Sequence, residues 1–194
     1  MPLKRILNAQ SVAVVGASKS ETKRGFQAVR TLIDEKYEGK IFPVNPKEKS
    51  VLGFRCYEKV SDIEEPVDLA LITTPAGTIP AVLDDCGKKG VSGAVIIAGG
   101  FRESGAEGRR LEEEVVEAAN RNNVRIIGPN TSGMMNLKTG MNLVGLPDAP
   151  KGDIALVSQS GNMALTLMTE ARLKSHKGFC YYVGVGNESD IRFH

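Results

Sequence analysis

The 194-residue sequence contains no tryptophan, and only 5% of its residues are aromatic. A hydrophobic core must therefore consist of aliphatic side chains, for which an apolar content of 41% is sufficient. No apolar run approaches the roughly 20 residues of a transmembrane helix, and residues 1–7 lack the apolar stretch of a signal peptide. We therefore expect a cytoplasmic protein without a membrane partner.

Cysteine and histidine are scarce as well. Cys56, Cys86 and Cys180 lie far apart and are odd in number, so they predict neither a disulfide framework nor a metal cluster. We expect three buried or incidental thiols in a reducing cytoplasm. Of the two histidines, His176 lies between a predicted helix and a predicted strand and is expected in an exposed loop, whereas His194 is the last residue. The sequence therefore predicts no metal site.

An excess of one charge is also lacking. With 25 basic and 23 acidic residues the net charge is +2, which favours neither a nucleic-acid partner nor an anionic membrane surface. One charge-dense stretch is predicted to be the solvated face of a helix. It contains Glu103, Glu107, Arg109, Arg110, Glu112, Glu113, Glu114 and Glu117.

What the sequence does contain is a regular alternation of short apolar runs and amphipathic stretches. Predicted strands cover residues 12–16, 40–45, 67–73, 93–98 and 124–127, and predicted helices cover residues 25–36, 79–88 and 106–120. The apolar runs are nearly continuous, as in strands that are covered on both faces. The first helix is expected to bury Phe26, Val29, Leu32 and Ile33. This order predicts an α/β fold with a Rossmann-like, doubly wound and mostly parallel sheet.

The pattern changes after residue 127. Residues 128–133 form a loop rich in turn formers, and residues 134–150 carry only weak strand signals. Met134, Met135 and Met141 are expected to pack against the domain or a partner. A linker at residues 148–152 places a domain boundary near residue 151, which divides the chain into residues 1–150 and 151–194. The second part is predicted to begin another α/β domain, with a strand at 154–157, a helix at 162–173 and a strand at 178–183.

Two of the predicted strands end in turns that suit an anion. The first turn begins at Gly16 and the second covers residues 158–161, and a predicted helix follows each. A helix that begins at such a turn directs free backbone N–H groups and the positive end of its dipole toward a bound phosphate. Lys19, Lys23 and Arg24 are expected to add a basic patch on the phosphate side of the first turn.

The first turn does not match the dinucleotide fingerprint. That fingerprint is G-x-G-x-x-G with an acid about 20 residues further on, but the second and third glycines are missing after Gly16. The next predicted strand ends at Asn45, and Lys47 and Lys49 follow it. A cationic strand end suits a phosphate on the ribose, which leaves NADP or coenzyme A. The missing glycines argue against NADP, because they permit the close approach to its pyrophosphate.

Turn-forming residues also follow three later strands. They are Thr73, Thr74 and Pro75 after the third strand, Gly99 and Gly100 after the fourth, and residues 128–130 after the fifth. Open α/β sheets bind their ligands beyond the carboxyl ends of the strands. Connections in this fold are rich in such residues in any case, so each loop alone is weak evidence. Together with the first turn, the loops predict one ligand site.

Five motifs in register resemble one family. They are Val-Val-Gly-Ala-Ser at 14–18, Val-Asn-Pro-Lys at 44–47, Asp-Leu-Ala-Leu-Ile-Thr-Thr-Pro-Ala at 68–76, Ile-Ile-Gly-Pro-Asn at 126–130 and Val-Ser-Gln-Ser-Gly at 157–161. The family is that of the NDP-forming (ADP-forming) acyl-CoA synthetases, relatives of the succinyl-CoA synthetase α subunit. The resemblance implies a CoA-binding Rossmann-like domain at residues 1–150, followed by the start of a flavodoxin-like ligase domain at residues 151–194.

The resemblance also implies a CoA site along the predicted strand ends. The CoA phosphates would meet Gly16, Ala17, Ser18 and Lys19, and the ribose phosphate would lie near Asn45, Pro46 and Lys47. The pantetheine would be flanked by Thr73, Thr74 and Pro75, with Gly99 and Gly100 close by, and the thiol would face Asn130. A helix aimed at a phosphorylated histidine would begin at Ser158, Ser160 and Gly161.

The family joins a carboxylic acid to CoA while ATP is converted to ADP and phosphate, or runs in reverse, through a phosphohistidine. Neither that histidine nor the ATP-grasp region that would bring ATP/ADP and Mg is found in these 194 residues. We therefore predict CoA binding without a catalytic residue, a carboxylic acid as the substrate of the parent enzyme, an ATP-grasp domain or subunit as partner, and an oligomer. Alternatives are a non-catalytic CoA-sensing regulatory module, the synthetase-like region of a protein acetyltransferase, and a redox enzyme.

Overall fold

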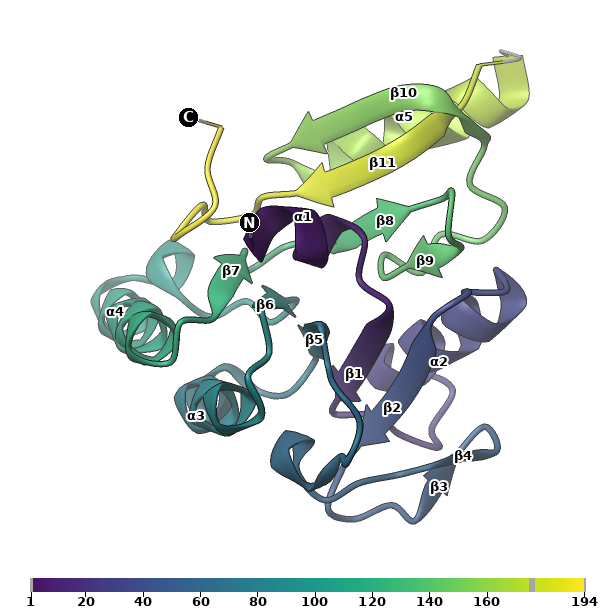
Figure 1. Cartoon of the computed structure of the whole chain (residues 1–194). Coiled ribbons are helices and arrows are strands. Elements are labelled where there is room, and N and C mark those ends of the chain that lie inside the picture. Colours follow the sequence, from purple (N-terminus) through teal and green to yellow (C-terminus); the bar gives the residue numbers. More distant parts are fainter. Residues whose placement is uncertain (1, 175–176, 194) are drawn as a thin grey trace.

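The computed structural model describes residues 2–174 and 177–193 and has a central parallel sheet with helices on both faces (Figure 1). The five strands lie in the order β2-β1-β5-β6-β7. They are β1 (Ser11–Val15), β2 (Lys40–Val44), β5 (Leu69–Ile72), β6 (Gly93–Ile96) and β7 (Arg125–Ile127). The helices of this part are α1 (Pro2–Leu7), α2 (Arg24–Asp34), α3 (Ile79–Lys89) and α4 (Ala106–Arg121). The expected doubly wound α/β fold is confirmed.

Alternating side chains along the strands build two core layers. Ala13 and Val15 of β1 pack with buried residues of α3 and α4 on one face of the sheet. Val12 and Val14 pack with buried residues of α2 on the other face, where Ile6 of α1 also lies. Because successive side chains of a strand point to opposite faces, each run of consecutive apolar residues supplies both layers at once.

The strand order creates a crevice at the carboxyl edge of this sheet. β1 lies between β2, which follows it in the chain, and β5, so the strand order reverses between β1 and β5. Such a reversal is where open α/β sheets bind ligands. After β2 the chain forms a short hairpin of β3 (Ser50–Val51) and β4 (Phe54–Arg55), and a bridge between Val44 and Tyr57 ties it back to β2. The sequence did not predict this hairpin.

A second sheet lies beside the first and has the order β10-β11-β8-β9 (Figure 1). Its strands are β8 (Met134–Asn136), β9 (Met141–Asn142), β10 (Lys151–Ser158) and β11 (Phe179–Gly184). β10 and β11 are parallel and are connected by α5 (Gly161–Lys174), whereas β8 and β9 join antiparallel. The sheet takes strands from both sides of residue 151, so the domain boundary stays a prediction.

The three methionines are buried, as expected, whereas α5 and β10 expose apolar side chains. Met134 and Met141 belong to the α2 side of the first core and Met135 to the core of the second sheet, and none of the three is exposed. Helix α5 and the edge strand β10 carry exposed apolar side chains, which are Ile154, Val157, Met163, Leu167 and Leu173.

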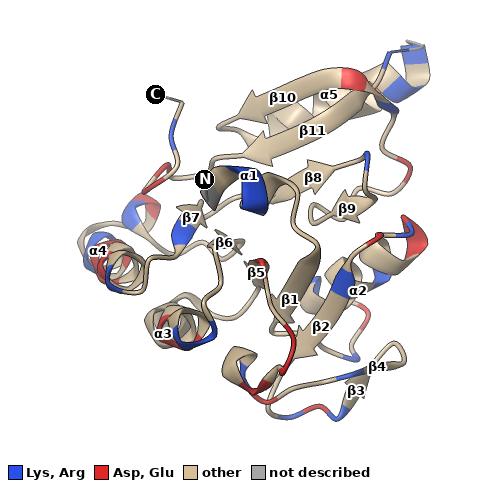
Figure 2. Ribbon diagram, viewed as in Figure 1, with Lys and Arg blue, Asp and Glu red and all other residues tan. Residues whose placement is uncertain are grey.

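Two expectations about the surface are wrong. Ile33 was expected to be buried but is 37% exposed. Consecutive helical residues point about 100° apart, so Leu32 faces the sheet and the next residue, Ile33, does not. Glu112, predicted on a solvated helix face, is only 6% exposed and accepts hydrogen bonds from Asn187 and Ser189. The segment after β11 covers that side of α4, while acidic and basic residues are mixed along the helix (Figure 2).

The cysteines are buried free thiols, as expected. Burial raises the pKa of Cys86 to about 12, so this thiol stays protonated at neutral pH. Within residues 2–174 and 177–193, no helix has the length and apolar character needed to cross a membrane, and no group of three or more His, Cys, Asp or Glu side chains could hold a metal ion. His176 and His194 lie outside the described residues.

We predict that Leu71→Ala strongly destabilises the protein. Leu71 lies in the buried strand β5 and has no exposed surface, so its truncation leaves a cavity and lowers the free energy of unfolding by about 2–5 kcal/mol. The control is Leu167→Ala, the same change at a side chain that is 49% exposed, which should shift that energy by less than about 0.5 kcal/mol. Urea titration followed by circular dichroism measures both variants, and equal losses would contradict the placement of Leu71 in the core.

Candidate functional site

The candidate site is centred on the turn after β1, where the surroundings require Gly16. This residue has a φ of +90°, and its N–H donates to the Val44 carbonyl at 2.9 Å. A Cβ atom at this position would lie 2.6 Å from Oγ1 of Thr73. Only glycine combines this backbone conformation with the missing side chain. The turn therefore brings together the ends of β1, β2 and β5.

A second glycine supports the turn, and sequence reasoning missed it. α2 begins at Arg24, and a Cβ atom on Gly25 would lie 2.1 Å from the carbonyl oxygen of Gly16. The start of the helix packs directly on the turn, which is the role of the third glycine in the dinucleotide fingerprint. The fingerprint spacing itself is absent, as expected, and Gly25 takes this role from another position. It comes nine residues after Gly16, where a search at the usual spacing does not find it.

Asn45, at the end of β2, fixes the turn from the other side. Its Nδ2 donates to the Ala17 carbonyl at 2.6 Å, and its Oδ1 accepts from the Lys47 N–H at 2.9 Å. Ser18 is buried, and its Oγ accepts from the Ser20 N–H at 3.1 Å. Two of the segments expected to hold phosphates are thus joined by one amide side chain.

The basic residues of the turn have partners of their own. Lys19 Nζ lies 3.3 Å from Glu48 Oε2, so a carboxylate lies beside the turn. Arg24, expected in the phosphate-side patch, instead donates through Nη2 to the carbonyls of Ser132 at 3.2 Å and Leu143 at 3.0 Å. Burial lowers the pKa of Arg24. Arg24 therefore joins the start of α2 to the residues before β8 and after β9. The expectation that it belongs to the basic patch is wrong.

The end of β5 supplies the opposite wall. Thr73 Oγ1 donates to the Val15 carbonyl at 2.9 Å and so holds the ends of β1 and β5 together. Thr78 Oγ1 lies 2.9 Å from Thr74 Oγ1 and donates to the Pro75 carbonyl at 2.7 Å. These bonds fix the loop that connects β5 to α3.

A cavity of about 500 Å³ opens between these walls. Five of the predicted residues line it: Gly16, Asn45, Pro46, Thr74 and Pro75. The residues that sequence reasoning missed include Lys59 and Val60 after the hairpin and Ala81, Val82 and Lys88 on α3. No motif marks these positions, which come together only when α3 packs on the sheet. The cavity has apolar walls, and its lining carries Lys59 and Lys88 together with Glu58 and Asp85, so it suits a ligand with an apolar body and polar groups.

Three other predicted residues form a second group, at the ends of β6 and β7. A Cβ atom on Gly99 would lie 3.2 Å from Asn130 Oδ1, so these two residues adjoin. Gly100 has a φ of +98°, and a Cβ atom there would lie 3.9 Å from the Cβ atom of Ala76, which follows Pro75. The group therefore lies next to the β5 wall but is not part of the lining of the cavity.

The loop after β6 is held by a carboxylate of its own. Glu103 Oε1 accepts from the N–H groups of Gly100 at 2.7 Å and Phe101 at 3.0 Å, and Oε2 accepts from Asn187 Nδ2 at 2.7 Å. Partial burial alone would raise the pKa of Glu103, but these hydrogen bonds outweigh it and hold the pKa below its usual range. Glu103 was predicted on a solvated helix face. It is exposed, as predicted, but it lies in a short 3-10 helix (Arg102–Ser104), and its carboxylate holds the preceding turn.

Ser158, Ser160 and Gly161 lie at the start of α5. Ser158 Oγ donates to the Ser160 carbonyl at 2.9 Å, and the Met163 N–H donates to Ser160 Oγ at 3.4 Å. A Cβ atom on Gly161 would lie 2.7 Å from the Cβ atom of Ser132. The arginine that begins α2 bonds to the same Ser132, so the amino ends of α2 and α5 lie near each other.

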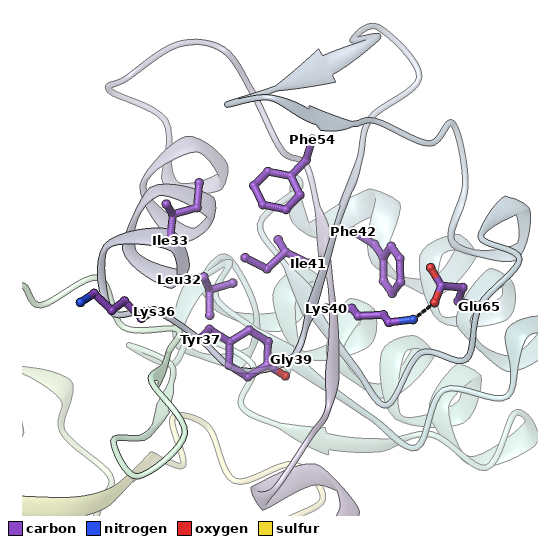
Figure 3. Close-up of a pocket in the computed structure, with 10 residues that line it drawn as sticks. All are labelled: Leu32, Ile33, Lys36, Tyr37, Gly39, Lys40, Ile41, Phe42, Phe54 and Glu65. Carbon is purple, nitrogen blue, oxygen red and sulfur yellow. Dashed lines mark hydrogen bonds and ion pairs between the residues drawn. The ribbon is translucent and has the colours of Figure 1, made fainter.

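A separate hollow of about 450 Å³ lies at the other end of β2 (Figure 3). Its apolar lining includes Leu32, Ile33, Ile41, Phe42 and Phe54, and an ion pair joins Lys40 to Glu65 beside it. Lys40 begins β2, whereas ligands of open α/β sheets bind at the carboxyl ends of the strands. The hollow in Figure 3 is therefore not part of the candidate site.

The matches to known families agree with the fold and the cavity. Residues 10–136 match the model of the CoA binding domain, and residues 151–194 match the model of the succinyl-CoA ligase like flavodoxin domain. The first part of the chain is thus a CoA-binding domain. The chain belongs to the CoA-binding domain family, and the resemblance of the five motifs to the NDP-forming (ADP-forming) acyl-CoA synthetases is confirmed.

Two curated relatives cover almost all of this chain. It is 44% identical to the ADP-forming acetate–CoA ligase of Methanocaldococcus jannaschii, over 98% of this chain and 26% of that protein. It is 40% identical to the alpha subunit of ADP-forming acetate–CoA ligase II of Pyrococcus furiosus, over 96% of this chain and 40% of that protein. The chain therefore spans less than half the length of these relatives.

A solved structure has the same fold over the whole chain. It is the dinucleotide forming acetyl-coenzyme A synthetase 1 of Ca. Korarchaeum cryptofilum in complex with phosphate and ADP. The TM-score is 0.94 at 39% sequence identity, over 100% of this chain and 41% of that chain. The structural similarity thus includes both sheets of this chain and corresponds to less than half of the longer synthetase chain.

Gly25→Ala is expected to destabilise the protein. In an open helix this change adds up to about 1 kcal/mol of stability, but here the new methyl group overlaps the Gly16 carbonyl oxygen, and such overpacking costs about 1–3 kcal/mol. Gly77→Ala is the matched control, because a Cβ atom at Gly77 would have no other atom within 4 Å. Urea unfolding compares the two variants. A stabilised Gly25→Ala protein would contradict the close packing of α2 on the turn.

Proposed function

We propose that this chain binds coenzyme A in the cavity at the carboxyl ends of β1, β2 and β5. The observation that carries the proposal is the convergence of the Gly16 turn, Asn45 and the Thr74–Pro75 wall on one cavity. This cavity lies where the strand order reverses, which is the usual nucleotide position in open α/β sheets. Membership of the CoA-binding domain family favours coenzyme A over other nucleotides.

The phosphate end of CoA would lie on the turn and the start of α2. Backbone N–H groups and the positive end of the α2 dipole favour an anion there. The Lys19–Glu48 ion pair has to open when the phosphates bind. Lys19 is 61% exposed, and exposed pairs contribute less than about 1 kcal/mol, so a phosphate can take over Lys19 at little cost. The residues assigned to this end are Gly16, Ala17, Ser18 and Lys19 for the phosphates and Asn45, Pro46 and Lys47 for the ribose phosphate.

The pantetheine would extend from the cavity along the loops after β5 and β6. Gly100 adjoins Ala76 beside the β5 wall, and Asn130 adjoins Gly99, so neighbouring loops lead from the cavity toward Asn130. The residues assigned to this path are Thr73, Thr74, Pro75, Gly99 and Gly100. The thiol would lie near Asn130.

We further propose that the parent enzyme interconverts a carboxylic acid, CoA and ATP with acyl-CoA, ADP and phosphate. The names of the relatives favour this reaction. Another domain or subunit would supply the phosphohistidine and the ATP-grasp region with its Mg. Ser158, Ser160 and Gly161 would direct the start of α5 at that histidine, and the exposed apolar side chains of α5 and β10 suit contact with further structure. We expect a cytoplasmic oligomer.

CoA is expected to stabilise the protein against heat, whereas NAD and NADP are not. A ligand that binds only the folded state adds about 2.7 kcal/mol at a hundredfold excess over its Kd, which raises the unfolding temperature by several degrees. Dye-based thermal unfolding with each nucleotide measures the shift. A clear shift with NADP and none with CoA would overturn the proposed function.

Lys47→Ala is expected to narrow the difference in affinity between CoA and dephospho-CoA. Dephospho-CoA lacks the 3′-phosphate and should bind the unaltered protein more weakly than CoA does. Lys138→Ala, which removes an exposed lysine between β8 and β9, is the control and should leave the affinity ratio unchanged. Isothermal titration measures both ligands. Equal affinities for the unaltered protein would remove Lys47 from the phosphate site.

A further inference from the structure

Asn187, which follows β11, connects three segments that are distant in the sequence. It is 6% exposed, and its N–H donates to the Pro129 carbonyl at 2.9 Å. Its Nδ2 donates to Glu103 Oε2 at 2.7 Å and to Glu112 Oε2 at 2.9 Å, and its Oδ1 lies 3.3 Å from the donor Nδ2 of Asn130. One side chain thus contacts the loop after β6, helix α4 and the loop after β7.

The two carboxylates, Glu103 and Glu112, also accept hydrogen bonds from the backbone that follows β6. Glu103 accepts from the N–H groups of Gly100 and Phe101. Glu112 accepts from the Arg102 N–H at 3.1 Å and, through its other oxygen, from the hydroxyl of Ser189. Three consecutive N–H groups of the loop therefore point at carboxylates whose positions depend on Asn187.

The chemistry of this position calls for an amide side chain. The buried Glu112 requires hydrogen-bond donors, and an amide can donate to both carboxylates while its oxygen accepts from Asn130 Nδ2. A carboxylate at position 187 would add a third negative charge beside Glu103 and Glu112. An apolar residue would leave the buried Glu112 with fewer donors, which is costly in a protein interior.

We propose that Asn187 is a positioning residue for the thiol end of the CoA groove. The proposal rests on the proposed function, because it assumes that CoA lies along these loops. Asn187 holds Asn130 directly and holds the N–H groups of Gly100 and Phe101 through Glu103. It does not reach the Gly16 turn or Asn45, which hold the phosphate end by bonds of their own. The two ends of the groove are therefore supported independently.

This independence gives a test that uses two ligands. CoA spans both ends of the groove, whereas adenosine 3′,5′-bisphosphate carries only the nucleotide end. Asn187→Asp keeps the shape of the side chain but replaces its donor with an acceptor. We expect it to weaken CoA binding by about tenfold or more, because both hydrogen bonds that Nδ2 donates are lost and a negative charge is added beside two carboxylates. The affinity for adenosine 3′,5′-bisphosphate should change by less than about twofold. Isothermal titration measures both, and circular dichroism verifies that the variant is folded.

A second variant carries the test if Asn187→Asp does not fold. Glu103→Ala removes an exposed side chain and with it the acceptor of the Gly100, Phe101 and Asn187 donors, so it should cause the same selective loss of CoA affinity. Glu107→Ala, at an exposed glutamate in the first turn of α4, is its control and should change neither affinity.

Ser189→Ala distinguishes a specific effect on the thiol end of the groove from a general loss of stability. This residue bonds to Glu112 but to neither Glu103 nor Asn130, so it should lower the unfolding temperature and leave the ratio of the two affinities unchanged. The proposal is overturned if Asn187→Asp and Glu103→Ala weaken both ligands equally or weaken neither, or if Ser189→Ala changes the ratio as they do. If the unaltered protein bound adenosine 3′,5′-bisphosphate and not CoA, the proposed function itself would fail.

Discussion

The rest of the site depends on the contact between the start of α2 and the carbonyl oxygen of Gly16. A Cβ atom on Gly25 would lie 2.1 Å from that oxygen, so the contact exists only because position 25 has no side chain. It brings free N–H groups of the helix onto the turn, which gives the turn its affinity for anions. The same contact sets the position of Arg24, whose guanidinium reaches the carbonyls of Ser132 and Leu143. Because Gly25 has no side chain, α2 can pack on the Gly16 turn, and this packing also positions the Arg24 hydrogen bonds to Ser132 and Leu143.

The two sheets are joined at both ends of the proposed groove. Arg24 makes the connection beside the phosphate turn, and Asn187 makes it beside Gly99 and Asn130. Both connections end on the loop of residues 128–133, which leads from β7 into β8. Arg24 bonds to Ser132, whereas Asn187 bonds to Pro129 and Asn130, so each part of the loop is held by a partner of its own. The second sheet is therefore part of the support of the groove rather than an appendage to it.

The sequence predicted those features that follow from local pattern. Consecutive apolar residues such as Val12 to Val15 indicated strands covered on both faces, and turn formers at strand ends indicated the Gly16 turn, Asn45 and Thr73, which the structure brings together. Features that depend on distant segments were not predictable in this way. The charges around Glu112 are typical of a solvated helix, and only the fold shows that residues 187–189 cover it. The role of Gly25 was not predicted, because it lies nine residues after Gly16, farther than the third glycine of the dinucleotide fingerprint lies from the first.

The unequal support of the two ends fits the proposed ligand. Phosphates are held by backbone dipoles and lysines, whose attraction falls off gradually with distance, so small displacements matter little. A reacting thiol must be placed to within a fraction of an ångström or so, because reaction rates depend steeply on the geometry of the attacking atom. The proposed phosphate end has exposed lysine side chains such as Lys19, which is 61% exposed. The thiol end instead has buried side chains with several fixed partners, of which Asn187 is 6% exposed and Glu112 is 6% exposed. Asn187 and Glu112 therefore support the end of the proposed ligand where precise placement has the greater effect.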